Sequence, residues 1–402
     1  MNSNKQPGIN TVEILFSLLS FEMGAEYRRD PNELTDAKTL AKVCELADFH
    51  DLAHLIANAL TRLSVIPTNE RLAEAISKKQ LHAILRAEHI DSELDDITKL
   101  FESEGIDYTP LKGAVIRELY PERWMRTSGD IDILVREEDA KRASELLIQK
   151  LSYSFEDNGS HDIQLKSPSG VPLELHFSLV DEDFAPEPLK HVWDFTYCHE
   201  ATSKRKYLTD EMLVFYHVVH MAKHVKHGGC GIKPLLDMLV LEKSGKLDEG
   251  LSTELLKKSG LEIFFEVAKK LAKVWFAGEK HDELTKSLED YILSAGVYGN
   301  LQNAVAAGQS ERGGKFKYLM SRAFPSYGIM KYRYPILQKH KYLLPFCYIA
   351  RWFNALFRGK TKSAVAELKL NTESPQKAQS ISHLMNDLGL NKYSERKNDG
   401  NN

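Results

Sequence analysis

The sequence predicts an α+β protein in which a small mixed β-sheet is embedded in a mostly helical chain. Apolar residues recur at helical spacing over residues 10–104 and again over about 210–307. Between these regions, short segments alternate apolar and polar residues, as half-buried strands do. The expected strands and extended segments are 107–111, 131–135, 161–165 and 173–177. At 402 residues, the chain can bury a substantial core in two or three domains.

The N-terminal region is predicted to be helical up to a glycine. Helical spacing is clear in residues 12–19, 35–47 and 52–63. A further apolar stripe predicts a helix that ends near Gly105, because glycine readily adopts the left-handed conformation that closes many helices. That stripe consists of Leu94, Ile97, Leu100 and Phe101.

The α/β core is predicted to follow this helical region. Helices over 114–120 and 137–151 separate its first strands, and Ser167-Pro168-Ser169-Gly170 supplies the turn of an antiparallel hairpin. Beyond residue 363 the chain becomes polar, and residues 395–402 have the composition of a disordered end. The expected divisions are 1–104 (N-terminal helical region), 105–200 (α/β core), 201–310 (helical domain), 311–363 (basic aromatic helical segment) and 364–402 (polar, partly disordered tail).

Composition narrows the class of protein. The chain is 43% hydrophobic and 27% charged, as ordinary globular proteins are, and its net charge of −4 gives no global reason to expect nucleic-acid binding. Its four cysteines form no C-x-x-C pair, which is typical of a reducing cytoplasm. Residues 1–8 lack a signal-peptide pattern, and the apolar stretch 342–357 is too short to span a membrane. We therefore expect a cytoplasmic protein.

Two acidic residues in Gly129-Asp130-Ile131-Asp132-Ile133-Leu134-Val135 are the strongest chemical signal. The period of a strand places Asp130 and Asp132 on one face, opposite the aliphatic residues, at roughly 6–7 Å from each other. Two ionised carboxylates this close are stable when a cation lies between them. Oxygen ligands favour Mg²⁺, which usually keeps room for substrate phosphates. The pattern therefore favours phosphoryl-transfer chemistry.

The surroundings of this pair carry further groups for phosphate chemistry. Lys112-Gly113 lies between an extended segment and a helix, where a glycine lets backbone N–H groups approach a phosphate. Lys112 adds a point charge, and the guanidinium of Arg126 can bind a phosphate through two hydrogen bonds. Downstream, Glu174 and His176 share one face of another strand. Glu174 would be the third carboxylate of a two-metal site.

These residues together resemble a known superfamily. The series Leu111-Lys112-Gly113, Tyr120-Pro121, Arg126, Gly129-Asp130-Ile131-Asp132, His161 and Glu174-Leu175-His176 resembles the polymerase-β-type nucleotidyltransferases, and more narrowly a little-characterised bacterial family of stand-alone members. The close resemblance covers about residues 105–180. It implies a nucleotidyltransferase core in which Asp130, Asp132 and Glu174 hold two Mg²⁺ ions, or Mn²⁺, and Gly113 lies in the phosphate loop. The superfamily usually has Gly-Ser there, so Lys112 or Arg126 would replace the serine hydroxyl.

Four histidines recur at spacings of 3, 4 and 3 residues and share one face of a predicted helix, within an arc of about 80°. They are His217, His220, His224 and His227. The favoured interpretation, which the resemblance supports, is a polar face along the active-site cleft, with His220, Lys223 and His224 binding nucleotide or acceptor phosphates. A metal site and a solvated face remain alternatives, and no H-E-x-x-H motif is present.

Two more histidines, His161 and His176, lie close to the acidic residues in the predicted sheet. A histidine can act as a general base or donate to a phosphate. In a two-metal mechanism the ions already activate the nucleophile, so no protein base is required. We therefore expect both histidines to position substrate or metal ligands, although ordinary hydrogen-bonded histidines would have the same pattern.

A basic aromatic segment, residues 315–362, lies outside the expected site. It mixes positive charge with aromatic rings: Lys315, Lys317, Arg322, Lys331, Arg333, Lys339, Lys341 and Arg351 among Tyr332, Tyr334, Tyr342 and Trp352. Three interpretations stay open. The segment can be an amphipathic helical subdomain, a peripheral membrane contact, or an RNA-binding surface.

The function we expect is transfer of a nucleoside monophosphate from an NTP such as ATP to an acceptor hydroxyl, with pyrophosphate leaving. The acceptor can be a sugar phosphate, a small molecule, a protein or an RNA end, and the sequence does not distinguish among them. Two alternatives remain: a non-catalytic, regulatory nucleotide-binding protein, and a membrane-peripheral accessory protein of a biosynthetic cluster. The altered Lys-Gly-Ala loop is the feature that keeps the first alternative open.

Overall fold

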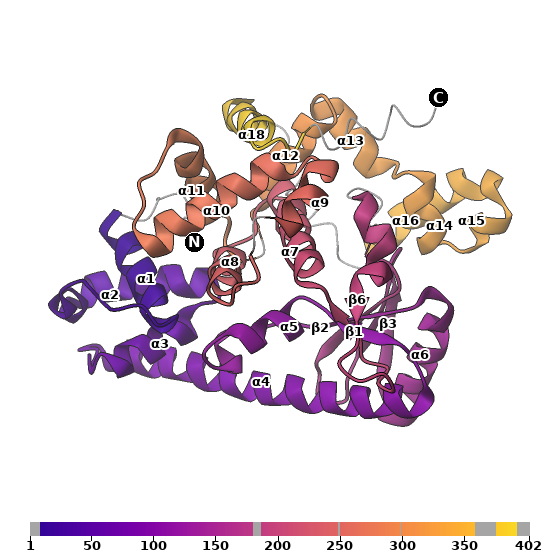
Figure 1. Ribbon diagram of the computed structural model, residues 1–402. Coiled ribbons are helices and arrows are strands. Elements are labelled where there is room, and N and C mark those ends of the chain that lie inside the picture. The colour runs from indigo at the N-terminus through magenta and orange to yellow at the C-terminus, as the bar shows by residue number, and fades with distance from the viewer. Residues whose placement is uncertain (1–8, 180–185, 248–249, 298, 358–374, 392–402) are drawn as a thin grey trace.

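The computed structural model describes residues 9–179, 186–247, 250–297, 299–357 and 375–391. The chain opens with a helical region and then a long helix, α4, which runs under the sheet to the far side of the molecule (Figure 1). The helix α4 ends at Gly105, which has the left-handed φ of +70° that the sequence predicts. The elements of this part are α1 (Ile9–Glu22), η1 (Pro31–Thr35), α2 (Ala37–Phe49), α3 (Ala53–Arg62) and α4 (Glu70–Glu104).

A mixed sheet of five strands follows, in the order β1-β2-β5-β4-β3. Only the central pair, β2 and β5, is parallel, and all the other neighbours are antiparallel. The predicted hairpin is present, and Gly170 closes its turn with a φ of +85°. The strands are β1 (Tyr108–Pro110), β2 (Ile131–Val135), β3 (Ser154–Asn158), β4 (Asp162–Lys166) and β5 (Pro172–His176). The predicted α+β class, with a small mixed sheet in a mostly helical chain, is confirmed.

The two faces of the sheet differ in chemistry. Aliphatic side chains of β2 and β5 pack on one face against α4 and α6, in a core that includes Ile131, Ile133, Leu173 and Leu175. On the other face the strand register places Asp132 beside Glu174, with Gln164 next to Glu174 on β4. Asp132 is nevertheless buried, because helices cover this face as well. The period of β2 therefore separates acid from aliphatic residues as predicted, although Asp132 itself is closed off from solvent.

The segment between β1 and β2 is less helical than the sequence predicts. In place of one helix over 114–120 it forms α5 (Gly113–Ile116), η2 (Arg117–Leu119) and η3 (Arg123–Met125). Tyr120 is extended because it precedes Pro121, whose ring disfavours a helical conformation at the preceding residue. The predicted helix over 137–151 is present as α6 (Glu137–Leu151). Short elements then lead away from the sheet: η4 (Glu187–Phe195), β6 (Thr196–Tyr197) and β7 (Tyr207–Leu208).

The helices after the sheet pack back onto the N-terminal helices. They are α7 (Asp210–Lys226), α8 (Lys233–Lys243), α9 (Leu251–Ser259), α10 (Glu262–Ala277), α11 (Glu283–Ala295) and α12 (Leu301–Glu311). One hydrophobic core joins residues of α1–α3, such as Leu15 and Leu55, with residues of α7, α8 and α10, such as Phe215 and Leu271. Helices from before and after the sheet in the sequence therefore share one hydrophobic core. The predicted domain boundaries stay a prediction.

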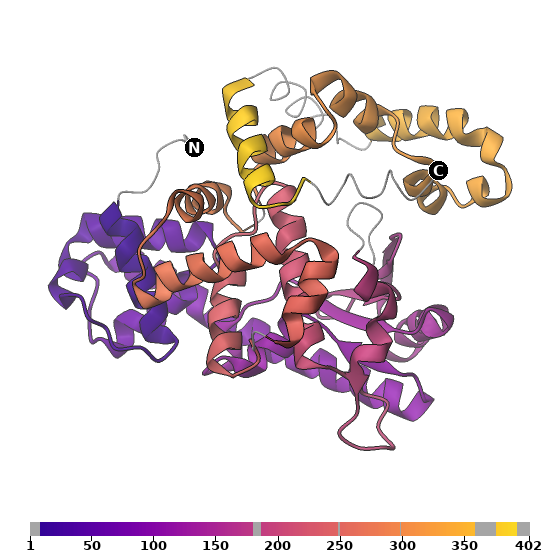
Figure 2. The ribbon, with the colours of Figure 1, turned by 45° about the horizontal axis from the view of Figure 1, so that its top comes forward.

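The C-terminal part forms a separate group of short helices beside the body (Figure 2). These are α13 (Lys315–Ala323), α14 (Tyr327–Arg333), α15 (Ile336–Lys339), η5 (Lys341–Leu343) and α16 (Leu344–Phe357). Helix α18 (Pro375–Asp387) packs on α12. The remaining parts of the predicted tail, 364–374 and 392–402, and residues 358–362 of the basic segment lie outside the described residues. Across the part of the chain that is described, no helix has the length and apolarity needed to cross a bilayer.

The end of α4 provides a test of backbone strain. Gly105→Ala should lower the free energy of unfolding by about 1 kcal/mol, because a side chain at a φ of +70° is strained although the space there is open. Gly250→Ala is the matched control, since Gly250 already has a right-handed φ of −80° and open space around it. Urea denaturation measures both. Equal midpoints for the two variants would contradict the expected strain at Gly105.

Candidate active site

The site begins with two carboxylates on neighbouring parallel strands. Asp132 of β2 and Glu174 of β5 are direct neighbours in the register, and parallel strands lie about 4.8 Å apart. Asp132 is 4% exposed, whereas Glu174 is partly open to solvent. Their repulsion requires positive charge nearby, because burial weakens the screening by water. Two side chains, Lys112 and His176, meet this need.

Lys112 lies against the buried carboxylate. Its Nζ is 2.8 Å from Oδ1 of Asp132. Burial opposes the charge of Lys112, but the nearby Tyr216 and the carboxylates of Asp132 and Glu174 outweigh burial and raise the pKa of the ammonium. Its backbone has φ +43° and ψ −115°, a conformation that costs on the order of 1–3 kcal/mol for a residue with a side chain. Lys112 therefore has a strained backbone, and in this conformation its ammonium contacts Asp132.

His176 bridges the two carboxylates from the end of β5. Its Nε2 is 2.9 Å from Oδ1 of Asp132 and 3.3 Å from Oε2 of Glu174. Because both partners are acceptors, Nε2 carries a proton. Burial lowers the pKa of His176, but its hydrogen bonds to Asp132 and Glu174 outweigh burial, so the pKa is raised. His161 stacks on the His176 ring, with 5.6 Å between the ring centroids.

Asp130 lies one residue before β2 and faces a different set of partners. The hydroxyl of Ser128 donates to its carbonyl at 2.8 Å and to its carboxylate at 3.3 Å. Burial raises the pKa of Asp130, and the charges of Asp132 and Glu174 raise it further, against the effect of Lys112. The structure thus places Asp130 in the field of the two other carboxylates.

The carboxylates of Asp132 and Glu174 fit a divalent cation, and His176 could join them as a ligand only by giving up the Nε2 proton that it donates to both. The ligand atoms of Asp132, Glu174 and His176 all lie within 4.8 Å of one another. Asp130 is not part of this group of three, although its pKa responds to both carboxylates. Carboxylate oxygens suit Mg²⁺ or Mn²⁺. A cation here would share Asp132 with the ammonium of Lys112, whose charge would lower the affinity.

Arg126 is fixed by a buried aspartate of the helical body. Its Nη2 and Nε contact the two carboxylate oxygens of Asp237 at 2.9 and 3.3 Å, and the hydroxyl of Tyr120 donates to the same carboxylate at 2.7 Å. Gly113 packs closely on this guanidinium, since a Cβ there would lie 2.5 Å from Nη1 of Arg126. The structure therefore brings the predicted loop glycine and the predicted arginine together, with part of the guanidinium already paired.

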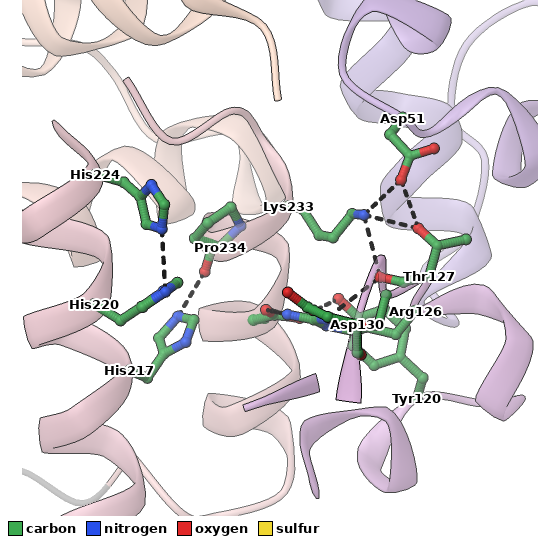
Figure 3. A network of polar contacts seen from close by, with 12 residues as sticks. Asp51, Tyr120, Arg126, Thr127, Asp130, His217, His220, His224, Lys233 and Pro234 are labelled. Carbon is green, nitrogen blue, oxygen red and sulfur yellow. Dashed lines mark hydrogen bonds and ion pairs between the residues drawn. The ribbon is translucent and has the colours of Figure 1, made fainter. Parts of the chain in front are cut away.

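Lys233, whose side chain is 12% exposed, joins three segments that are distant in the sequence (Figure 3). Its Nζ is 2.7 Å from Oδ2 of Asp51 and 2.7 Å from the hydroxyl of Thr127, and Thr127 also donates to Asp51 at 2.8 Å. Burial lowers the pKa of Lys233, partly offset by Asp51. Lys233 begins α8, Asp51 lies between α2 and α3, and Thr127 follows Arg126. This contact therefore ties the loop before β2 to both helical parts.

The histidines of α7 lie on the face that looks toward these cations (Figure 3). Nε2 of His224 is 3.1 Å from Nε2 of His220, and Nε2 of His217 donates to the carbonyl of Pro234 at 2.9 Å. Burial and the charge of Lys112 lower the pKa of His220 well below its ordinary value. Burial, Lys112 and Lys223 lower the pKa of His224 to about 4. Both imidazoles are therefore neutral at pH 7.

The position of His227 differs from that of the other three histidines. It is the cap that follows α7, and its Nδ1 contacts the carbonyl of Lys223 at 2.6 Å. His220 thus lies in the field of Lys112 and Asp132 and His224 in that of Lys112, while His217 is bound to the start of α8. Sequence reasoning did not find Tyr216, Ser128, Thr127, Asp51 or Lys233. Only Tyr216 carried a signal, since it precedes His220 by one helical turn.

The fold and the paired carboxylates define a class of protein, namely chains that place acidic groups on adjacent strands of a small mixed sheet for phosphoryl-transfer chemistry. Residues 36–277 match the model of a family described as an uncharacterised nucleotidyltransferase. The chain belongs to this nucleotidyltransferase family, as the resemblance predicted. Searches of curated proteins and of solved structures found no match. The matched range runs from α2 to α10 and includes every site residue named above.

The buried pair of Arg126 and Asp237 provides a second test. Asp237→Ala should lower the free energy of unfolding by about 3–5 kcal/mol, because it leaves a guanidinium that is only 14% exposed without its carboxylate partner. Glu74→Ala, which removes the exposed pair with Lys78, should change it by less than about 0.5 kcal/mol. Chemical denaturation of the Asp237→Ala and Glu74→Ala variants measures both changes in the free energy of unfolding. A loss at Asp237 no larger than at Glu74 would show that the pair does not stabilise the junction.

Buried neutral histidines make stability depend on pH. Burial lowers the pKa of His50 and of His54 to about 4, below the value of about 6.5 in an unfolded chain. The unfolded state therefore binds more protons between pH 6.5 and 4, and stability is lost as the pH falls through this range. His54→Gln keeps a donor for the carbonyl of Met125, which lies 2.9 Å from His54 Nε2.

The His54→Gln variant should thus flatten the curve of unfolding free energy against pH by up to about 1.4 kcal/mol per pH unit between pH 6 and 4. Urea denaturation at a series of pH values measures this slope. Parallel curves for the wild type and the variant would contradict a neutral, buried His54. His50→Gln gives an independent second measurement, because both ring nitrogens of His50 are buried without a hydrogen-bond partner among the described residues.

Proposed function

We propose that this chain transfers a nucleoside monophosphate from an NTP to an acceptor hydroxyl. The acceptor oxygen forms a bond to the α-phosphorus, the bond to the bridging oxygen breaks, pyrophosphate leaves and the hydroxyl proton passes to solvent. The observation that carries the proposal is the pairing of Asp132 with Glu174 across two parallel strands, beside Asp130. Membership of a nucleotidyltransferase family supports the same reaction class.

The acidic residues would hold the metal ions. We assign Asp130, Asp132 and Glu174 as ligands of two Mg²⁺ ions, or Mn²⁺, which when bound would neutralise charge on the α-phosphate and lower the pKa of the acceptor hydroxyl. His176 contacts both Asp132 and Glu174, so its role is to keep the two carboxylates facing each other. His161, stacked on His176, supports that ring.

The basic residues would bind the triphosphate. Lys112 precedes Gly113 in the loop where the superfamily usually has Gly-Ser, and its ammonium is already inside the site on Asp132. We propose that a bound triphosphate competes with Asp132 for this ammonium. Asp237 binds Nε and Nη2 of Arg126, and Nη1 donates to the carbonyl of Thr127 at 3.3 Å, so a phosphate beside Gly113 would take the second N–H of Nη1. The strain at Lys112 supports this assignment, since strained residues cluster at functional sites.

The α7 residues would contact the nucleotide or the acceptor. His220 and His224 are neutral at pH 7, so they can donate or accept hydrogen bonds without adding charge. Lys223 lies on the same helix, close enough to lower the pKa of His224. We propose that His220, Lys223 and His224 form the side of the site opposite the sheet.

The acceptor is the least constrained part of the proposal. A sugar phosphate, a small molecule, a protein and an RNA end all offer a hydroxyl. Incubating the purified chain with each NTP labelled at the α-phosphate, together with cell extract, and identifying the labelled species would name both the nucleobase and the acceptor.

One observation favours a second function, nucleotide binding without transfer. Oδ1 of Asp132 already accepts from both Lys112 and His176, so its charge is balanced within the protein itself. Titration of Mg²⁺-NTP in a calorimeter, followed by an assay for pyrophosphate, separates the two functions. Binding without pyrophosphate release, in the presence of extract, would establish the regulatory alternative.

The metal ligands give the sharpest test of transfer. Asp132→Asn and Glu174→Gln should each lower the rate of pyrophosphate release by at least about 1,000-fold, because the charge that binds the ions supplies several kcal/mol to the transition state. Amides of the same shape keep the hydrogen-bonding geometry, so far-UV circular dichroism should be unchanged. Glu156→Gln, on the exposed strand β3, is the matched control and should keep full activity. Activity within about tenfold of wild type in either site variant would exclude the metal mechanism.

A further inference from the structure

The α13–α16 segment has a charge composition unlike the rest of the chain. The chain as a whole carries a net charge of −4, yet residues 312–357 contain no Asp or Glu. Their basic residues are Arg312, Lys315, Lys317, Arg322, Lys331, Arg333, Lys339, Lys341 and Arg351. The segment lies beyond residue 277, where the family match ends. Its positive charge is therefore local, and it attracts an anionic partner at close range, within a screening length of about 8 Å.

The same segment exposes large apolar side chains along one face of α16. Phe346, Ile349 and Phe353 follow each other at spacings of three and four residues, and they are 67%, 46% and 57% exposed. Tyr342, in the 3-10 turn just before α16, is 72% exposed. The opposite face of α16 is the packed one, and it carries Leu344, Cys347 and Tyr348. Among the described residues, helix α16 is therefore apolar on both faces, and the face of Phe346, Ile349 and Phe353 is the exposed one.

The exposed face is held in place by a small core and by defined hydrogen bonds. Met330, Leu337 and Cys347 form that core. Trp352 Nε1 donates to the carbonyl of Ala323 at 3.1 Å, and the hydroxyl of Tyr348 donates to the carbonyl of Pro325 at 2.7 Å. These bonds join α16 to the end of α13. The group of helices stands beside the body rather than inside it, so its outer face is accessible (Figure 2).

The chemistry of the face distinguishes among three occupants. Single-stranded RNA stacks on aromatic rings, but it gains little from Ile329, Ile336 and Ile349, which are 41%, 53% and 46% exposed. A second copy would bring two acid-free segments together, and like charges would repel. An anionic bilayer satisfies both features, because its headgroups bind lysine and arginine while its interface accepts aromatic and aliphatic side chains.

We propose that the α13–α16 segment binds the surface of an anionic membrane. The face of Tyr342, Phe346, Ile349 and Phe353 enters the headgroup region, where aromatic rings are favoured. Exposed basic residues of the same segment, including Arg333 and Lys339, bind anionic headgroups. The chain is thereby held at the membrane surface without a spanning helix. This surface is independent of the proposed transferase site and acts in the absence of NTP.

The test is co-sedimentation of the full chain with vesicles of phosphatidylcholine, with or without phosphatidylglycerol. The chain should bind the anionic vesicles only, and added salt should weaken binding. The double variant Phe346→Ser/Phe353→Ser should lower the partition coefficient by at least about tenfold, because each buried ring contributes strongly to partitioning. Arg333→Gln and Lys339→Gln should each lower it about fivefold.

Matched controls come from other surfaces of the same chain. Ile66→Ser/Leu81→Ser changes two exposed apolar residues near α4, and Lys141→Gln changes an exposed lysine of α6; neither should alter binding. Equal binding to neutral vesicles, or no loss in the Phe346→Ser/Phe353→Ser variant, would overturn the proposal. So would binding of single-stranded RNA without vesicle binding. A concentration-dependent dimer that the same variant abolishes, again without vesicle binding, would assign the face to a second copy instead.

Discussion

The structure depends most on the pairing of Asp132 with Glu174 across β2 and β5. Two carboxylates on adjacent parallel strands repel each other, and the buried one cannot rely on water to screen it. Lys112 and His176 balance this charge by donating to the same oxygen of Asp132. To place that lysine, the chain adopts a φ of +43° at Lys112, so strain in the backbone is part of how the charge is balanced. The sheet, the loop and the end of β5 are therefore arranged around one buried carboxylate.

Two ion pairs, one on the buried Asp237 and one on the exposed Asp51, connect this site to the helical body. Asp237 of α8 binds Arg126, and Lys233 at the start of the same helix binds Asp51 and Thr127. Arg126 and Thr127 are consecutive residues, so α8 contacts the loop before β2 at two adjacent residues. A buried pair such as Arg126–Asp237 contributes little net stability compared with apolar packing. Any arrangement that separates the two charges would, however, lower the stability strongly, and this favours a single geometry of the junction. The helices on both sides of the sheet thereby set the position of the loop that leads to Asp130.

The sequence allowed much of the sheet to be predicted, and less of what surrounds it. The alternation in 131–135 and 173–177, and the Pro-Ser-Gly turn, correspond to β2, β5 and the hairpin. The strand β3 was missed because all its residues are exposed and all but Phe155 are polar, without a buried face to impose a pattern. The helix predicted over 114–120 is divided because Pro121 acts on the residue before it. Local rules thus succeed where periodicity or a turn residue is present, and they fail where packing decides.

The sequence by itself determined the spacing of the acids, the period that puts them opposite the aliphatic residues, and the segment rich in basic and aromatic residues. These are local properties, since a strand or helix period relates residues only a few positions apart. Only the tertiary structure decided that Lys112 meets Asp132, that Asp237 meets Arg126, and that Lys233 meets Asp51. Contacts between residues 20, 111 and 182 positions apart leave no periodic signal in one sequence. They arise because the helices bury one shared core and bring the charges together as they pack.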